Sequence, residues 1–233
     1  MEGTARDRNT RKKLNNGVEM PIFGLGVYKS ADGEETYNAV RWALDAGYRH
    51  IDTASIYRNE TGVGQGIRES GVPREEIFVT TKIWNNKRGY EKTRESVEKS
   101  LERLGLDYLD MVLIHWPAAP HRVENWEELN QSTWQALTDL YKEGKIRAIG
   151  VSNFKPHHLK ALLEAEAAGR IPHGEIALVV SNNPGAYALE RAKNFGVPGA
   201  VITRKECGSK EAFVSTLQAV LERNGTDLII LAG

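Results

Sequence analysis

Four polar side chains that follow short apolar segments could together protonate a carbonyl oxygen. Asp52 and Tyr57 lie in IDTASIY, Lys82 ends FVTTK, and His115 lies in LIHW. A phenol has a pKa near ~10, so a neighbouring Lys82 ammonium that lowers it would make Tyr57 a better proton donor. Asp52 would hold Lys82 in an ion pair, and His115 would hydrogen-bond to the oxygen that Tyr57 protonates. The hydride of a reduction would then come from a cofactor.

Each of these four residues taken singly is more typical of a structural role. Asp52 suits a turn or helix cap, Lys82 an exposed strand end, His115 a hydrogen-bonded interior position and Tyr57 half-buried packing. The catalytic interpretation therefore depends on the four residues meeting in space.

Alternating apolar runs and amphipathic stretches predict repeated strand and helix units around a mostly parallel sheet, whose strands end at one shared edge. Glycines that permit a left-handed C-terminal residue close the expected helices. The expected strands are residues 21–27, 48–54, 76–82, 108–116, 146–152, 175–182, 199–203 and 227–233. The helix-ending glycines are Gly47, Gly71, Gly105, Gly144, Gly169, Gly196 and Gly225.

This pattern predicts an α/β fold, an eight-stranded (β/α) TIM-like barrel that lacks the last helix. The Asn-Gly pair in KKLNNGVEM predicts an N-terminal hairpin. An open or partly open parallel sheet is the alternative. We expect residues 1–10 to be a disordered leader and residues 11–233 to form one domain.

The composition favours small-molecule chemistry. The chain has 233 residues, with 31 Lys and Arg against 31 Asp and Glu, so we expect neither nucleic acid nor a membrane as a partner. Its single cysteine agrees with a cytoplasmic location, and we expect a monomer. No histidine has the i, i+4 spacing of a metal site, so no metal is predicted.

The same residues stand in segments that resemble the aldo-keto reductase family over about residues 11–163. The segments are NNGVEMPIFGLGVYK, GYRHIDTASIYRNETGVG, FVTTKIW, SLERLGLDYLDMVLIHWP and GKIRAIGVSNF. The resemblance implies a barrel that reduces a small carbonyl substrate with NADPH. It implies catalytic roles for Asp52, Tyr57, Lys82 and His115.

The resemblance also implies binding residues. Trp84 and Trp116 would form apolar walls for the substrate. Ser152 and Asn153 would bond the nicotinamide carboxamide, although a helix cap is the alternative for both. The further cofactor-binding residues that the resemblance implies are Gly26, Val27, Tyr28 and Asp52.

Later segments of that family have no counterpart in the sequence. We find no Asn-Gln-x-Glu strand, no aromatic residue before Ser-Pro and no Lys-Ser and Arg clamp for the 2′-phosphate. Without these contacts, cofactor binding would weaken, so the sequence predicts weak carbonyl reduction or none.

Residues from about 161 to 233 instead resemble the phosphoribosylglycinamide formyltransferase family, through ALLEAEAAGRIPHGEIALVVSNNPGAYALERAKNFGVP and TDLIILAG. We therefore expect an engineered or recombined chimera in which residues 164–233 complete the barrel begun by residues 11–163. A chimera with a fold but no activity is one alternative function, and formyltransferase-like binding is a weaker one, because that family's catalytic residues have no counterpart here. In a closed barrel residues 227–233 would pair beside 21–27, and in an open sheet beside 146–152.

Overall fold

A computed structural model of the chain describes most of its first two thirds and parts of the remainder. The described residues are 7, 9–14, 16–117, 125–169, 179–181, 184–185, 189–190, 193, 196 and 198–223.

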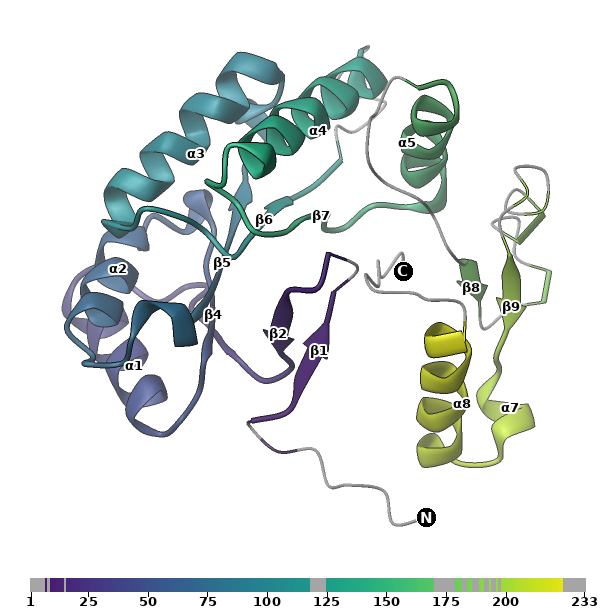
Figure 1. Ribbon diagram of the computed structural model, residues 1–233, viewed down its shortest axis with the longest axis horizontal. Coiled ribbons are helices and arrows are strands. Elements are labelled where there is room, and N and C mark those ends of the chain that lie inside the picture. The colour runs from purple at the N-terminus through teal and green to yellow at the C-terminus, as the bar shows by residue number, and fades with distance from the viewer. Residues whose placement is uncertain are drawn as a thin grey trace.

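A five-stranded parallel sheet forms the centre of the fold, with its strands in sequence order (Figure 1). The expected strand and helix units are therefore present in this part of the chain. Each strand is followed by a helix that lies on the outer side of the sheet (Figure 1). The strands are β3 (Leu25–Gly26), β4 (His50–Asp52), β5 (Phe78–Ile83), β6 (Met111–Ile114) and β7 (Ile149–Val151). The helices are α1 (Glu34–Asp45), α2 (Glu60–Arg68), α3 (Tyr90–Leu104), α4 (Trp126–Lys142) and α5 (Pro156–Ala167).

The strand that we expected over residues 21–27 is shorter in the structure. Its first residue ends β2 (Glu19–Pro21), which pairs antiparallel with β1 (Arg11–Lys13), and only Leu25–Gly26 joins the parallel sheet. The predicted hairpin is thus confirmed. Leu14, in the hairpin loop, is buried against Phe78 and Met111, so the hairpin covers the amino ends of β5 and β6.

The last described part of the chain contains a second, two-stranded parallel sheet of β8 (Val179–Ser181) and β9 (Gly199–Val201). Two helices follow, α7 (Arg204–Cys207) and α8 (Lys210–Arg223). Figure 1 shows this part on the side of the molecule opposite α1 and α2. The expected strand at residues 227–233, whose position would distinguish a closed barrel from an open sheet, lies outside the described residues.

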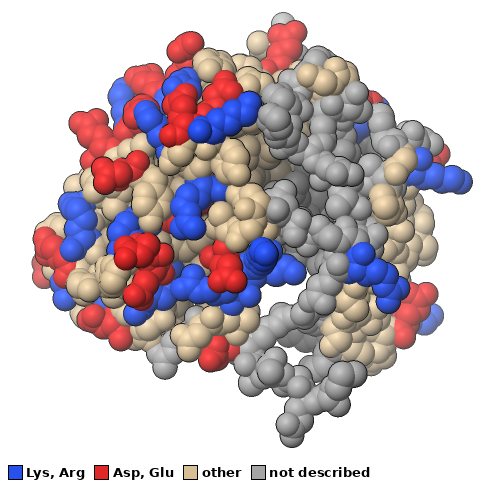
Figure 2. All heavy atoms as spheres, in the orientation of Figure 1, with Lys and Arg blue, Asp and Glu red and all other residues tan. Residues whose placement is uncertain are grey.

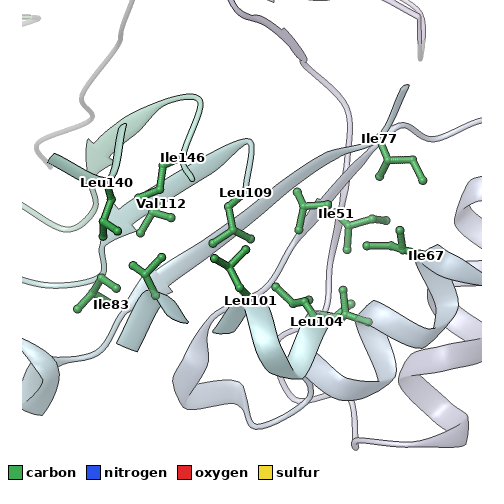
Figure 3. Packing of buried hydrophobic residues seen from close by; sticks show 14 of the residues in the cluster. Ile51, Ile67, Ile77, Ile83, Leu101, Leu104, Leu109, Val112, Leu140 and Ile146 are labelled. Carbon is green, nitrogen blue, oxygen red and sulfur yellow. The ribbon is translucent and has the colours of Figure 1, made fainter. Parts of the chain in front are cut away.

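The core lies between the sheet and its outer helices. Ile51, Leu109 and Val112 from the sheet side meet Leu101 and Leu104 of α3 (Figure 3). These side chains are buried, and their removal from water supplies the main stabilising contribution to this layer.

Glycines end the helices as the sequence predicts. Gly47, Gly71, Gly105, Gly144 and Gly169 follow described helices and have positive φ. Gly196 also has positive φ, but the helix expected before it lies outside the described residues, as does Gly225. Gly64 has a different role, because a Cβ there would overlap the Leu104 carbonyl of α3. Gly64 therefore allows α2 and α3 to pack closely.

The described helices give no sign of a membrane span, since none is long and apolar enough to be one. On the face shown in Figure 2, acidic and basic side chains are interspersed over the outer helices. Such mixing is typical of a surface that faces water.

Candidate active site

The carboxyl edge of the five-stranded sheet brings the four predicted catalytic residues together. Asp52 ends β4, Lys82 lies in β5, and His115 directly follows β6. Tyr57 ends a 3-10 turn, η1 (Ser55–Tyr57), that follows β4. The Lys82 Nζ atom lies 5.2 Å from the centroid of the Tyr57 ring, and the rings of Tyr57 and His115 lie 5.7 Å apart, edge to face.

Lys82 is buried, with 7% of its surface exposed, and its ammonium is held by two oxygens. Its Nζ donates to Asp52 Oδ1 at 2.5 Å and to the carbonyl oxygen of Thr53 at 2.8 Å. The Asp52 side chain remains 35% exposed. A buried ammonium needs such compensation, so Asp52 and Lys82 function as one unit.

The pKa of Tyr57 moves in the direction opposite to our prediction. Burial raises the pKa of the Tyr57 phenol above its usual value, and the charges of Asp52 and Tyr28 raise it further. Burial is the largest cause of the difference, and the Asp52 carboxylate also compensates the Lys82 ammonium that was expected to lower the pKa. Tyr57 is therefore protonated at neutral pH, the form that a proton donor requires.

His115 is neutral in this environment. Burial, followed by the charge of Lys82, lowers the pKa of its imidazole to about 4. Its Nδ1 atom is buried and has no hydrogen-bond partner within the described residues. A neutral imidazole has one N–H donor and one acceptor nitrogen, so it can hydrogen-bond a polar group without carrying charge.

The first loop, residues 27–30, lies beside Tyr57. Gly26 pairs in register with Asp52, and the Val27 amide donates to the Asp52 carbonyl at 3.1 Å. Tyr28 is 67% exposed and its ring lies 5.0 Å from that of Tyr57. Among the described residues, no atom lies within 4 Å of a Cβ placed on Gly26, so these residues leave open space at this position.

The two tryptophans differ in their relation to His115. The Trp84 ring lies 5.2 Å from the His115 ring, edge to face, and forms part of the same cluster. Trp116 follows His115 in the chain and is 46% exposed.

Ser152 and Asn153 follow β7 at the same edge of the sheet. Asn153 has a left-handed backbone, with φ of 61°, and its Nδ2 atom donates to the His115 carbonyl at 2.8 Å. It also donates to Ser152 Oγ at 3.0 Å. Because α5 begins only at Pro156, neither residue directly precedes the helix as its cap.

These residues fit one end of a nicotinamide nucleotide. The described residues leave open space at Gly26, Ser152 presents a hydroxyl donor, and Asn153 presents its amide oxygen, since both of its N–H donors are in use. Among the described residues, no group of three His, Cys, Asp or Glu side chains could hold a metal ion.

Sequence reasoning missed Asn59, which is fully buried two residues after Tyr57. Its side-chain amide forms hydrogen bonds with Val27, Ser30 and Thr53. Ser55 was also missed, and its Oγ donates to the Lys82 carbonyl at 2.9 Å. The available signal was the density of polar residues in DTASIYRNE directly after an apolar strand.

The fold and the polar cluster together define an α/β protein with a group of ionisable side chains at the carboxyl edge of a parallel sheet. A model described as the Aldo/keto reductase family matches residues 22–194, and the chain belongs to this family.

Individual relatives agree with this assignment. The chain is 61% identical over 152 residues to a 9,11-endoperoxide prostaglandin H2 reductase of Trypanosoma cruzi, covering 65% of this chain and 51% of that protein. It is 59% identical over 152 residues to a glyoxal reductase of Bacillus subtilis, covering 65% and 52%. The chain therefore spans about half the length of these curated relatives.

Solved structures show the same fold. An aldo/keto reductase of Brucella melitensis has a TM-score of 0.64 and 36% identity, covering 92% of this chain and 79% of that one. An aldo-keto reductase of Bombyx mori, solved in complex with NADP, has a TM-score of 0.61 and 27% identity, covering 98% and 85%.

The family match also bears on the predicted boundary at residue 163. It continues to residue 194, so it includes part of the segment that we expected to resemble a formyltransferase. The comparisons support the reductase resemblance and give no support to a formyltransferase fragment or a chimera.

Proposed function

We propose that the protein reduces a small aldehyde or ketone with NADPH. The observation that carries this proposal is the Asp52–Lys82 ion pair of 2.5 Å beside Tyr57, with His115 across the same edge. An ion pair, a phenol and a neutral imidazole form a group that can protonate a developing alkoxide.

Tyr57 is the proton donor in this proposal. Its O–H donates the proton to the carbonyl oxygen, and the phenolate that remains lies beside the Asp52–Lys82 ion pair, with Lys82 Nζ 5.2 Å from the ring centroid. Asp52 holds Lys82 in position, and neutral His115 donates a hydrogen bond to the same carbonyl oxygen.

The cofactor proposal rests on the family and on the residues at the sheet edge. When bound, NADPH would supply the hydride for this reduction. Ser152 and Asn153 would hold its carboxamide, while Gly26, Val27, Tyr28 and Asp52 would lie beside it. The Bombyx mori neighbour solved with NADP supports this choice of cofactor.

A small carbonyl compound is the substrate class that we propose. The relative named glyoxal reductase supports this class. Trp84, whose ring meets His115 edge to face, and the partly exposed Trp116 would form the apolar sides of the substrate site.

The missing later segments in the sequence favour a second candidate, a chain with this fold and no turnover. In that case, NADPH would lack the contacts from the Asn-Gln-x-Glu strand, the aromatic residue before Ser-Pro and the 2′-phosphate clamp.

Cofactor titration followed by a turnover assay separates the two candidates. We expect NADPH to change tryptophan fluorescence and to be oxidised when a reactive small aldehyde is added. The Tyr57→Phe variant should bind NADPH but oxidise it much more slowly. Absence of binding at millimolar NADPH would contradict the reductase proposal and favour the inactive fold.

A further inference from the structure

Asn59 connects the turn that carries Tyr57 with the first loop. Its side chain is fully buried, with 0% exposed. The Nδ2 atom donates to the carbonyl oxygens of Val27 at 2.8 Å and Ser30 at 3.1 Å. The Oδ1 atom accepts from the Thr53 hydroxyl at 2.9 Å. Both N–H donors of the amide and its oxygen are therefore in use.

The same network reaches the ion pair. The carbonyl oxygen of Thr53 accepts from Lys82 Nζ at 2.8 Å, so one residue bonds both Lys82 and Asn59. At the other end of the network, the loop held by Asn59 presents Tyr28, whose ring contacts Tyr57 at 5.0 Å. Asn59 thus lies between the two segments that flank the phenol.

The neighbouring Glu60 provides a contrast. It is also buried, but it bonds Thr81 of β5 at 2.7 Å and forms an ion pair with Arg103 of α3 at 2.5 Å. Glu60 therefore anchors α2 to the sheet and to the next helix, whereas Asn59 holds the first loop.

We propose that Asn59 is a positioning residue that locks the first loop to the turn carrying Tyr57 and so fixes the phenol relative to Lys82. This inference rests on the proposed carbonyl reduction for its effect on turnover. The coupling between the loop and the turn does not depend on that activity.

Hydrogen exchange measured by mass spectrometry on the free, full-length protein tests the coupling. Asn59→Ala removes all three bonds, and Thr53→Val removes only the hydroxyl and serves as the milder variant. We expect Asn59→Ala to accelerate exchange about tenfold or more in both residues 27–31 and residues 53–59, with a smaller rise in Thr53→Val. Acceleration in neither segment, or in only one, would overturn the inference.

Asp110→Asn is the matched control for a loss of stability alone. Asp110 is buried at the amino end of the sheet and pairs with Arg74 and Arg147, away from Tyr57. This variant should accelerate exchange around residues 77–80 and 109–112 while residues 27–31 and 53–59 stay as in the wild type.

Steady-state kinetics then test the effect on Tyr57. We expect Asn59→Ala to lower kcat by roughly ten- to a hundredfold, with KM for the aldehyde nearly unchanged, because a small displacement of an acid slows the chemical step. Loosening the loop should also shift the alkaline limb of kcat to lower pH, since burial is the largest cause of the raised Tyr57 pKa. An equal fall in kcat for Asp110→Asn, or an unshifted alkaline limb in Asn59→Ala, would overturn the positioning role.

If the wild type shows no turnover, the proposal of carbonyl reduction fails, and the exchange result alone decides whether Asn59 couples the two segments.

Discussion

At the level of single residues, Asp52 is the main charged group that raises the pKa of Tyr57, after the larger effect of burial. Its carboxylate compensates Lys82 and raises the pKa of the phenol. Asp52→Asn should leave the Lys82 ammonium uncompensated, so the pKa of Tyr57 should fall and the alkaline limb of kcat should move to lower pH. We also expect kcat to fall by roughly ten- to a hundredfold, because Lys82 loses the partner that orients it. A pH-rate profile checks this prediction, and an unchanged alkaline limb would contradict it.

The lowered pKa of His115 predicts that the protein becomes less stable in acid. Its pKa is about 4 in the folded protein, below the ordinary value of 6.5. Between these pH values the unfolded chain binds the proton and the folded chain does not, so the free energy of unfolding falls as the pH drops from 6.5 to 4. Replacing His115 with Gln should reduce this slope by at most about 1.4 kcal/mol per pH unit.

Urea unfolding at several pH values measures that slope. His158→Gln is a useful comparison, since burial also lowers the pKa of His158 to about 4 and this residue lies outside the proposed active site. Both variants should flatten the curve, whereas only His115→Gln should slow turnover. A slope that neither replacement changes would show that these histidines do not set the acid sensitivity.

At the level of elements, α2 and α3 approach so closely that Gly64 is required between them. A Cβ at this position would overlap the Leu104 carbonyl, which is backbone and cannot rotate away. Gly64→Ala should lower the free energy of unfolding by about 1–3 kcal/mol, measured with denaturant. Gln65→Ala, at an exposed position on the same helix, should change it by less than about 0.5 kcal/mol. Similar values for the two variants would contradict the close approach.

Most elements of the sheet could be predicted from local sequence patterns, but not the contacts between them. Helix ends were predictable because a glycine with positive φ is a local requirement, as at Gly105. The strand predicted at residues 21–27 was too long, because Pro21 belongs to β2 of the hairpin and pairs with Arg11 of β1. Asn59 was missed because its partners Val27 and Ser30 lie about thirty residues away.

The positions of three candidate site residues could be predicted, because residues at the ends of adjacent parallel strands lie close together. Asp52, Lys82 and His115 lie at or just beyond the ends of adjacent parallel strands, so the sequence order of the strands places them together. The pKa of Tyr57 was predicted in the wrong direction, because its value depends on burial and on a compensated charge. Neither quantity can be read from spacing along the chain.

At the level of the whole molecule, the chain belongs to the Aldo/keto reductase family and spans about half the length of its curated relatives. The five-stranded sheet contributes Asp52 and Lys82 to the proposed proton-donating group, while Tyr57 lies in the turn after β4 and His115 directly follows β6. The family match extends to residue 194, so the relation to reductases continues beyond this sheet. A turnover assay on the whole chain therefore tests whether the four residues support carbonyl reduction in this protein.

The most direct test of the account compares NADPH oxidation by the wild type and by Tyr57→Phe with glyoxal as substrate. We predict that kcat falls by at least about a hundredfold in the variant, while the Kd of NADPH from tryptophan fluorescence changes by less than about threefold. This result would assign the proton transfer to the phenol rather than to cofactor binding. Equal turnover by the two proteins would contradict the central claim that Tyr57 is the proton donor.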